Sequence, residues 1–222
     1  MTVHQDPFHA VLLPRLVLVA DGIVSGRPGM AAERVRRRVL EAVEAGVAWV
    51  QLRDHASSGE ALLEVAPPFV ERLRQAQPAL QLSVNGRVDL AAALGAGLHT
   101  GAHGPTIAEA RAEVGPFNPV GYSAHDADEA ARAAAEGADY VFLGPVFATN
   151  THPERAPLGP GALGDEGLRE HAVPVYAIGG VTAENVGEVR AAGAYGVAVL
   201  SGLLDEPDLG PTVEAYLRAL MA

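Results

Sequence analysis

The sequence contains no cysteine, which excludes disulfide bonds, thiolate metal sites and cysteine nucleophiles. It also has no excess of basic residues, because its net charge is −11. An acidic chain lacks the basic surface that nucleic acids and anionic membranes require, so neither is expected as a partner. A small anionic ligand is compatible with this charge, since backbone amides and a few local cations can bind it.

Long hydrophobic runs are absent as well. The N-terminus, MTVHQDPFHAVLLPRL, has no basic segment before its short apolar run, so neither a signal peptide nor a membrane span is predicted. A cytoplasmic location is therefore expected. Apolar residues make up 49% of the chain and charged residues 19%, which is typical of a folded domain and not of a disordered segment.

Eight short apolar runs alternate with segments of helical periodicity along nearly the whole chain. Continuous apolar runs of this length are typical of parallel strands that are covered on both faces. They occupy residues 15–21, 47–53, 81–85, 97–101, 119–125, 140–146, 174–180 and 196–202. In the second helical segment, Pro67 and Pro68 are expected to bend or break the helix.

Eight strand-plus-helix units without a break in composition predict an α/β fold, a single (β/α)8 TIM barrel. We expect the barrel to span residues 15–222, after an N-terminal extension over residues 1–14. The alternative is an open doubly wound sheet, which would carry a G-x-G-x-x-G turn after its first strand. The corresponding segment, VADGIVSGRPG, lacks that turn, so the barrel is favoured.

Polar residues cluster at the carboxyl ends of the predicted strands, where TIM barrels carry their active sites. The cluster comprises Asp21, Gln51, Arg53, His55, Asn85, Arg87, His99, His103, Ser123, His125, Thr149 and His152. The imidazole of His125 suits proton transfer near neutral pH, although a loop hydrogen bond would explain it equally well. Gln51 and Arg53 face the same way on their strand. Arg53 is expected either to contact an anionic ligand or to pair with Asp21 or Asp54.

Glycine turns follow the last two strands, at Gly179–Gly180 and at Ser201–Gly202. TIM barrels commonly bind a phosphate group there through backbone N–H groups, so a phosphate site is predicted; two ordinary turns are the alternative. The histidines His55, His99, His103 and His152 suggest a metal site. Carboxylates are scarce among these candidate ligands, however, and no metal is predicted.

Five segments together resemble one known superfamily. They are VQLRDH, NGRVDLAAALGAGLHTG, GYSAHDADEAARAAAEGADYVFLGPVFATNTH, AIGGVTAENV and GAYGVAVLSGLL, in order between Leu16 and Leu204. They resemble the thiamine phosphate synthase/TenI superfamily. The resemblance implies a TIM barrel that acts on thiazole phosphates in thiamine biosynthesis, with the phosphate held at the two glycine turns, and a homodimer.

Within this superfamily, the synthase joins a pyrimidine pyrophosphate to a thiazole phosphate. Its pattern has Asn-Asp-Arg where this chain has Asn85-Gly86-Arg87, and a second aspartate where this chain has Gly104. The resemblance implies that those two carboxylates hold Mg²⁺, and that two lysines of the pyrophosphate site are replaced here by His55 and His152. Neutral glycines cannot bind a cation that requires oxygen ligands, so Mg²⁺-dependent synthase activity is not expected.

The Asn-Gly-Arg triplet instead resembles the TenI branch, which implies a thiazole tautomerase. This reaction aromatises a carboxylated thiazole phosphate by removing a proton from ring C2 and delivering one to the exocyclic carbon, without a cofactor. The motif Ser123-Ala124-His125 matches the branch's catalytic histidine, which makes His125 the expected proton carrier. We expect Arg53 to bind the substrate carboxylate. The other expected substrate contacts are Gln51, Asn85, Ser123, Thr149 and His152.

Two alternatives remain open at this point. One is a thiamine phosphate synthase with a rearranged Mg²⁺ site, and the other is a non-catalytic regulator that binds a thiazole phosphate. The loop from Thr149 to Gly164 is rich in proline and glycine, and it is expected to close over the substrate as a lid.

Overall fold

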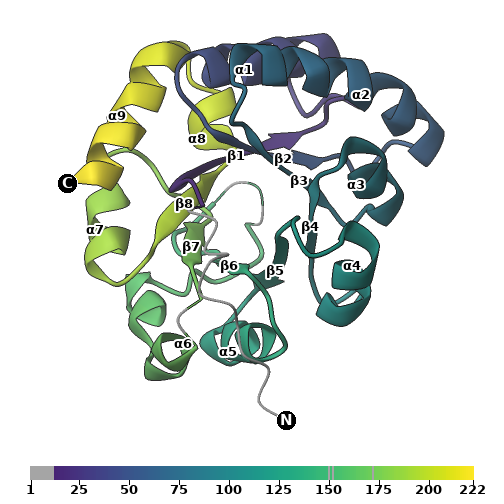
Figure 1. The fold of residues 1–222 in the computed structure, drawn as a ribbon. Helices are drawn as coiled ribbons and strands as arrows, with labels where there is room; N and C mark the ends of the chain where they lie inside the picture. The colour runs from purple at the N-terminus through teal and green to yellow at the C-terminus, as the bar shows by residue number, and fades with distance from the viewer. Residues whose placement is uncertain (1–12, 150, 152, 172) are drawn as a thin grey trace.

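The computed structural model describes residues 13–149, 151, 153–171 and 173–222, and these form a closed parallel barrel of eight strands (Figure 1). Each strand pairs with the next one along the chain, and β8 closes the ring against β1. The strands are Leu16–Asp21 (β1), Trp49–Arg53 (β2), Gln81–Asn85 (β3), Gly97–Thr100 (β4), Val120–Ala124 (β5), Tyr140–Leu143 (β6), Val175–Ile178 (β7) and Gly196–Val199 (β8). The predicted TIM barrel is confirmed.

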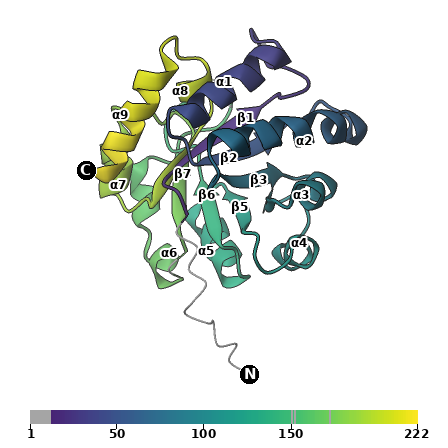
Figure 2. The same ribbon diagram turned by 45° about the horizontal axis from the view of Figure 1, so that its top comes forward.

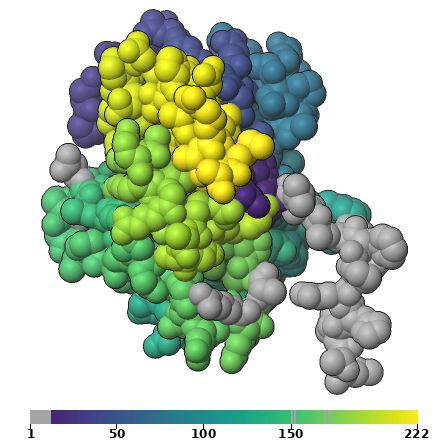
Figure 3. Space-filling view, turned by 90° about the vertical axis from the view of Figure 1, so that its left-hand side faces the viewer, coloured from purple at the N-terminus to yellow at the C-terminus, as the bar shows by residue number. Residues whose placement is uncertain are grey.

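Helices follow the strands in sequence and surround the barrel, as Figures 1 and 2 show. They are Ala32–Glu44 (α1), Gly59–Ala76 (α2), Val88–Leu94 (α3), Ile107–Val114 (α4), Ala127–Ala135 (α5), Glu166–Glu170 (α6), Val186–Ala191 (α7), Ser201–Leu204 (α8) and Leu209–Met221 (α9), with a 3₁₀ turn at Pro160–Gly164 (η1). The C-terminal α9, yellow in Figure 3, packs against α7 and α1. None of the helices in the described part of the chain is long and apolar enough to cross a membrane.

The barrel interior is filled by aromatic side chains that face glycines on neighbouring strands. Trp49, Tyr140, Phe142 and Tyr176 are buried there, and the Trp49 and Tyr140 rings meet edge to face with centroids 4.7 Å apart. A β-carbon on Gly121 would lie only 2.0 Å from the Tyr140 ring, so this glycine on β5 makes room for the large side chain on β6. Large residues on some strands and small ones on others thus pack together in the core.

Pro67 and Pro68 were expected to bend or break the second helix, and the expected break is wrong. Helix α2 runs without interruption through both prolines. Neither proline is buried, and Leu63 and Glu64, one turn earlier, are exposed. The carbonyl groups that lose their intrahelical donors can therefore bond to water, which limits the cost of the prolines.

Three of the strands end two or three residues earlier than predicted: β6 at Leu143, β7 at Ile178 and β8 at Val199. At the carboxyl end of the barrel, the apolar runs of β6 and β7 continue into loops, and that of β8 continues into α8. At the opposite end, Leu13 is buried against the interior cluster, and its carbonyl accepts a 2.6 Å hydrogen bond from the Tyr195 hydroxyl. Residues 1–12, which belong to the predicted N-terminal extension, lie outside the described residues.

Candidate active site

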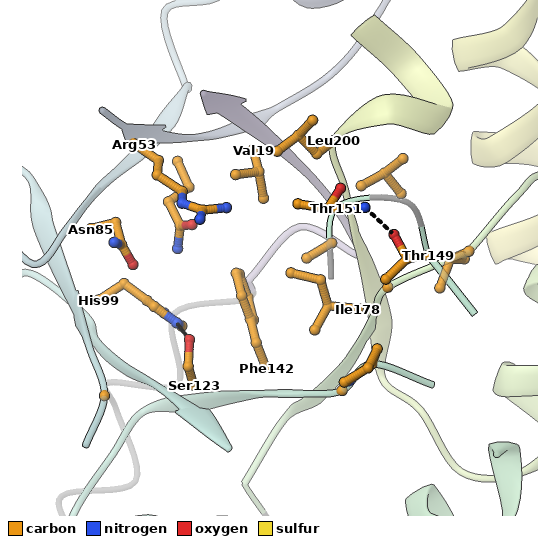
Figure 4. A pocket seen from close by; sticks show the side chains of 18 of the residues that line it. Val19, Arg53, Asn85, His99, Ser123, Phe142, Thr149, Thr151, Ile178 and Leu200 are labelled. Carbon is orange, nitrogen blue, oxygen red and sulfur yellow. Dashed lines mark hydrogen bonds between the residues drawn. The ribbon is translucent and has the colours of Figure 1, made fainter. Parts of the chain in front are cut away.

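A cavity of about 870 Å³ opens at the carboxyl ends of the strands (Figure 4). Most of the residues predicted to bind substrate or phosphate line it. These are Gln51, Arg53, Asn85, Ser123, His125, Thr149, Gly179, Gly180, Ser201 and Gly202. His152 lies outside the described residues. The structure therefore brings the predicted site together in one cavity, while the role of each residue stays a prediction.

Strand β2 contributes Gln51 and Arg53 to this cavity. Gln51 is only 3% exposed, and its Nε2 group has no hydrogen-bond partner of normal geometry among the described residues. A buried amide donor without a partner is costly, so Gln51 is suited to a ligand that offers an acceptor. The guanidinium of Arg53 points into the cavity (Figure 4), and its Nε lies 3.8 Å from Oδ1 of Asp21. This long ion pair leaves Arg53 able to contact an anion.

Asp54, the other expected partner of Arg53, instead fastens the loop after β1. Its carboxylate accepts hydrogen bonds of 2.9 Å from the backbone N–H groups of Val24 and Ser25 and of 3.1 Å from that of Ser57. Burial alone would raise the pKa of Asp54, but these hydrogen bonds together outweigh burial and hold its pKa below the usual value.

Strands β4 and β5 place two histidines in different environments. His99, expected at the rim, is instead inside the barrel and 1% exposed, because it faces inward from the middle of β4. Burial lowers the pKa of His99 to about 3, so its imidazole is neutral at pH 7. His125 follows β5 directly and is exposed to the cavity. Asp126 caps α5, where its side chain accepts a hydrogen bond from the Glu129 N–H.

The two glycine turns form the opposite wall of the cavity. Gly179 and Gly180 have φ angles of +89° and +65°, a region in which glycine is favoured. A β-carbon on Gly180 would lie 2.4 Å from the carbonyl oxygen of Ala148, and one on Gly202 would lie 2.5 Å from the Tyr216 hydroxyl. A side chain is thus excluded at Gly180 and at Gly202, and the backbone N–H groups there can approach an anion.

A family model described as thiamine monophosphate synthase matches residues 21–203. The chain belongs to the thiamine monophosphate synthase/TenI family. Among its relatives, thiamine-phosphate synthase of Chloroflexus aurantiacus is 37% identical, over 94% of this chain and 93% of that protein. Thiamine-phosphate synthase of Azorhizobium caulinodans is 40% identical, over 87% and 89% of the two chains. The structure of thiamine phosphate pyrophosphorylase from Pyrococcus furiosus matches with a TM-score of 0.77 and 27% identity, covering 93% and 95%.

The positions where the family resemblance places magnesium-binding carboxylates cannot supply them here. Gly86 and Gly104 both line the cavity without offering an oxygen ligand from a side chain. A β-carbon on Gly104 would also lie 2.4 Å from Oγ1 of Thr100, which donates a 2.7 Å hydrogen bond to the Pro105 carbonyl. Within the described part of the chain, no three His, Asp or Glu residues are placed to bind a metal ion. The donor set does not fit Mg²⁺.

The cationic side chains that line the cavity of this family member are arginines, because the whole sequence contains no lysine. Arg53 and Arg155 both line the cavity, as do the rim histidines His55 and His103. His99 and His103 stand four residues apart, but β4 ends between them, so one is buried and the other exposed. They do not form a metal pair. His55 Nε2 lies 3.5 Å from Asn85 Nδ2 at the rim.

The sequence reasoning missed several residues of the cavity. They include Arg155, Phe142, Ile178, Thr182, Asp205 and Glu206. Phe142 and Ile178 could have been found from strand alternation, because each lies two residues beyond another inward-facing residue on the same strand. Arg155 lies in an irregular loop, where no periodic signal marks which side chains face inward.

Proposed function

We propose that this protein is a thiazole tautomerase of thiamine biosynthesis, which aromatises a carboxylated thiazole phosphate. One observation carries the proposal: where the family pattern calls for carboxylates and lysines, the sequence has glycines and histidines, and Gly86, Gly104 and His55 among them line the cavity. A proton transfer requires neither Mg²⁺ nor a pyrophosphate site. It requires an acid/base group and a means of holding the substrate, and the same cavity offers both.

In this proposal each wall of the cavity has a role. The turns at Gly179–Gly180 and Ser201–Gly202 hold the phosphate through backbone N–H groups and the Ser201 hydroxyl. Arg53, on the other side, holds the substrate carboxylate and stabilises negative charge beside the carbon that loses its proton. His125 accepts the proton from ring C2 and returns one to the exocyclic carbon, so that substrate and product are isomers.

The test is the conversion of the carboxylated tautomer to the aromatic thiazole, followed by ultraviolet absorbance. Wild type is expected to accelerate it, and His125→Ala to lower kcat by about 10²- to 10⁴-fold, the usual contribution of acid/base catalysis. His103→Ala is the matched control, because His103 is another exposed histidine of the same cavity. Absence of acceleration by wild type would reject the tautomerase.

The role of Arg53 is tested separately. Arg53→Ala is expected to raise KM for the carboxylated substrate while leaving the affinity for the decarboxylated thiazole phosphate close to that of wild type. Arg155→Ala is the matched control, since it removes another arginine from the cavity. Unchanged kinetics of Arg53→Ala with the carboxylated substrate would reject the role.

Thiamine phosphate synthase is the second candidate, and two observations favour it. The relatives that are 37–40% identical over most of the chain carry that name. The cavity of about 870 Å³ is also larger than one thiazole phosphate requires, and could hold two ligands. Formation of thiamine phosphate from pyrimidine pyrophosphate and thiazole phosphate, with Mg²⁺ present, would establish this candidate. Binding of thiazole phosphate without turnover in either assay would leave the regulatory alternative.

A further inference from the structure

Two carboxylates lie on the same wall of the cavity as the proposed phosphate site. Asp205 and Glu206 are the acidic residues among the described residues that line the cavity. Asp205 lies one helical turn after Ser201, at the end of α8, and its backbone N–H donates to the Ser201 carbonyl at 3.1 Å. An uncompensated carboxylate this near would repel a phosphate dianion held at the turn. A phosphate site here therefore requires a positive charge close to Asp205.

Arg27 supplies that charge from a distant part of the sequence. Its Nη1 lies 2.6 Å from Oδ1 of Asp205, across 178 positions of the chain. Arg27 belongs to the loop between β1 and α1, and α1 packs against α8 (Figure 1). It is not among the described residues that line the cavity, so it acts on a bound ligand through its charge and not by contact.

The backbone of Arg27 is held independently of this ion pair. Its N–H and carbonyl groups exchange hydrogen bonds of 2.9 and 2.8 Å with those of Met30, which closes a tight turn. The side chain of Arg27 is only 11% exposed, and its Nε has no hydrogen-bond partner of normal geometry among the described residues. A buried guanidinium with an unpartnered N–H group is costly unless negative charge lies near it. Arg27 therefore favours anions at this end of the cavity.

We propose that Arg27 compensates the charge of Asp205 and thereby permits the turn at Ser201–Gly202 to hold a phosphate dianion. Arg27 is a positioning residue in this role, because it holds and neutralises Asp205 without touching the ligand. Its charge is only partly screened by water, since the side chain is largely buried. This inference rests on the proposed function for the phosphate site and not for the reaction, because any phosphate ester at this turn meets the same charges.

The test is a calorimetric titration of the full chain with inorganic phosphate at pH 8 and low ionic strength, where most of the phosphate is dianionic. Arg27→Met is expected to weaken binding about tenfold, because it leaves Asp205 uncompensated. The double variant Arg27→Met/Asp205→Asn lacks both charges and is expected to bind within about twofold of wild type. High salt should reduce the loss in Arg27→Met, since it screens the repulsion.

Asp205→Asn alone separates charge compensation from a merely structural ion pair. It changes a half-exposed side chain, so the variant should fold, and it leaves the charge of Arg27 uncompensated. Phosphate binding is therefore expected to tighten about threefold, whereas the loss of a structural tie would weaken it. Asp89→Asn is the matched control: it breaks another 2.6 Å pair, with Arg87, outside the described lining of the cavity, and should change nothing. Weaker binding by Asp205→Asn would overturn the proposal even if Arg27→Met failed to fold.

These outcomes are separate from that of the tautomerase assay. Phosphate binding with this charge dependence in a protein without tautomerase activity would reject the reaction and keep the inference. An active tautomerase whose phosphate affinity is unchanged in Arg27→Met would do the reverse. Absence of phosphate binding by wild type would overturn the phosphate site and the inference together.

Discussion

A β-carbon on residue 104 would lie 2.4 Å from Oγ1 of Thr100, whereas one on residue 86 would meet no atom within 4 Å. The two glycines that stand where the family pattern has aspartates therefore differ in how they would accept a side chain. Gly86 has open space but a φ angle of +68°, which aspartate tolerates at a modest cost. Gly104 lacks the space.

We therefore expect Gly104→Asp to lower the free energy of unfolding by about 1–3 kcal/mol, the usual cost of overpacking. In a Thr100→Ala background the same substitution should cost clearly less, because the obstructing hydroxyl is gone. Urea unfolding of the four proteins of this cycle measures the coupling. Strictly additive effects would show that Thr100 is not what excludes a side chain from residue 104.

The carboxylate of Asp54, at the end of β2, accepts hydrogen bonds from the loop after β1. Because the pKa of Asp54 is lowered, the stabilisation from these hydrogen bonds depends on pH. A lowered pKa means that the stabilisation is present above the unfolded-state value of about 4 and is lost as the pH falls through the folded-state value. Asp54→Asn should cost about 1–3 kcal/mol at pH 7 and progressively less below pH ~4, as measured by urea unfolding over a pH series.

Asp89→Asn is the control for that experiment. Its pKa is also lowered, chiefly by the hydrogen bond from Arg87, but the pair is largely exposed to solvent. Exposed pairs contribute less than about 1 kcal/mol, so the pH dependence of stability should change little. An equal effect of the two substitutions would contradict the role given to Asp54.

Arg38 on α1 fastens the C-terminal end of α8, the short helix that begins at Ser201. It is buried, and its guanidinium donates to the carbonyl groups of Leu203, Leu204 and Glu206. Arg38→Met should lower the free energy of unfolding by about 2–4 kcal/mol, since it leaves these carbonyls without donors. It should also weaken the binding of inorganic phosphate, measured by calorimetry, because Ser201 loses its support.

Arg37→Met is the matched control on the same helix, where the side chain of Arg37 is 67% exposed. It should change the free energy of unfolding by less than about 0.5 kcal/mol, as surface substitutions usually do. If Arg38→Met behaved in the same way, the carbonyl contacts of Arg38 would not be stabilising α8.

The segment from Thr149 to Gly164 supplies Thr149, Thr151 and Arg155 to the cavity wall. We expect it to close over the bound substrate, which would slow hydrogen–deuterium exchange in residues 153–164 when thiazole phosphate is added. Exchange in the peptide that contains α4 should not change, because this helix lies outside the barrel. Equal exchange in the free and bound protein would contradict the expected lid.

The sequence was sufficient for the barrel and for the neighbourhood of its site. Each strand has an apolar run of its own, and polar residues such as Arg53, Asn85 and His125 follow those runs at the end where the site lies. These predictions succeed because they depend on local structure: side chains alternate along a strand, so the end of a strand fixes the direction of the side chain that follows. The sequence did not predict the hydrogen-bond partner of each polar group, because that partner depends on the register of several strands.

His99 and Asp54 show that limit. In the sequence, His99 follows an apolar residue near the end of its strand, as a histidine at the rim of the barrel would. Only the pairing of β4 with β5 shows that His99 contacts Ser123 inside the barrel. Asp54 looked like an ion-pair partner for its neighbour Arg53, yet it bonds to backbone N–H groups 29 and 30 residues away. The prolines of α2 misled for another reason, since their cost depends on which carbonyls water can reach.

Trp49 is the only tryptophan of the chain, and it is fully buried among Tyr140, Phe142 and Tyr176. Its emission spectrum therefore reports on the centre of the barrel and on nothing else. On unfolding, the indole moves from an apolar interior to water, and its fluorescence should shift to longer wavelength. A substitution that loosens the aromatic core without unfolding the chain should shift the emission only in part. The protein thus carries its own intrinsic probe of the packing of its barrel interior.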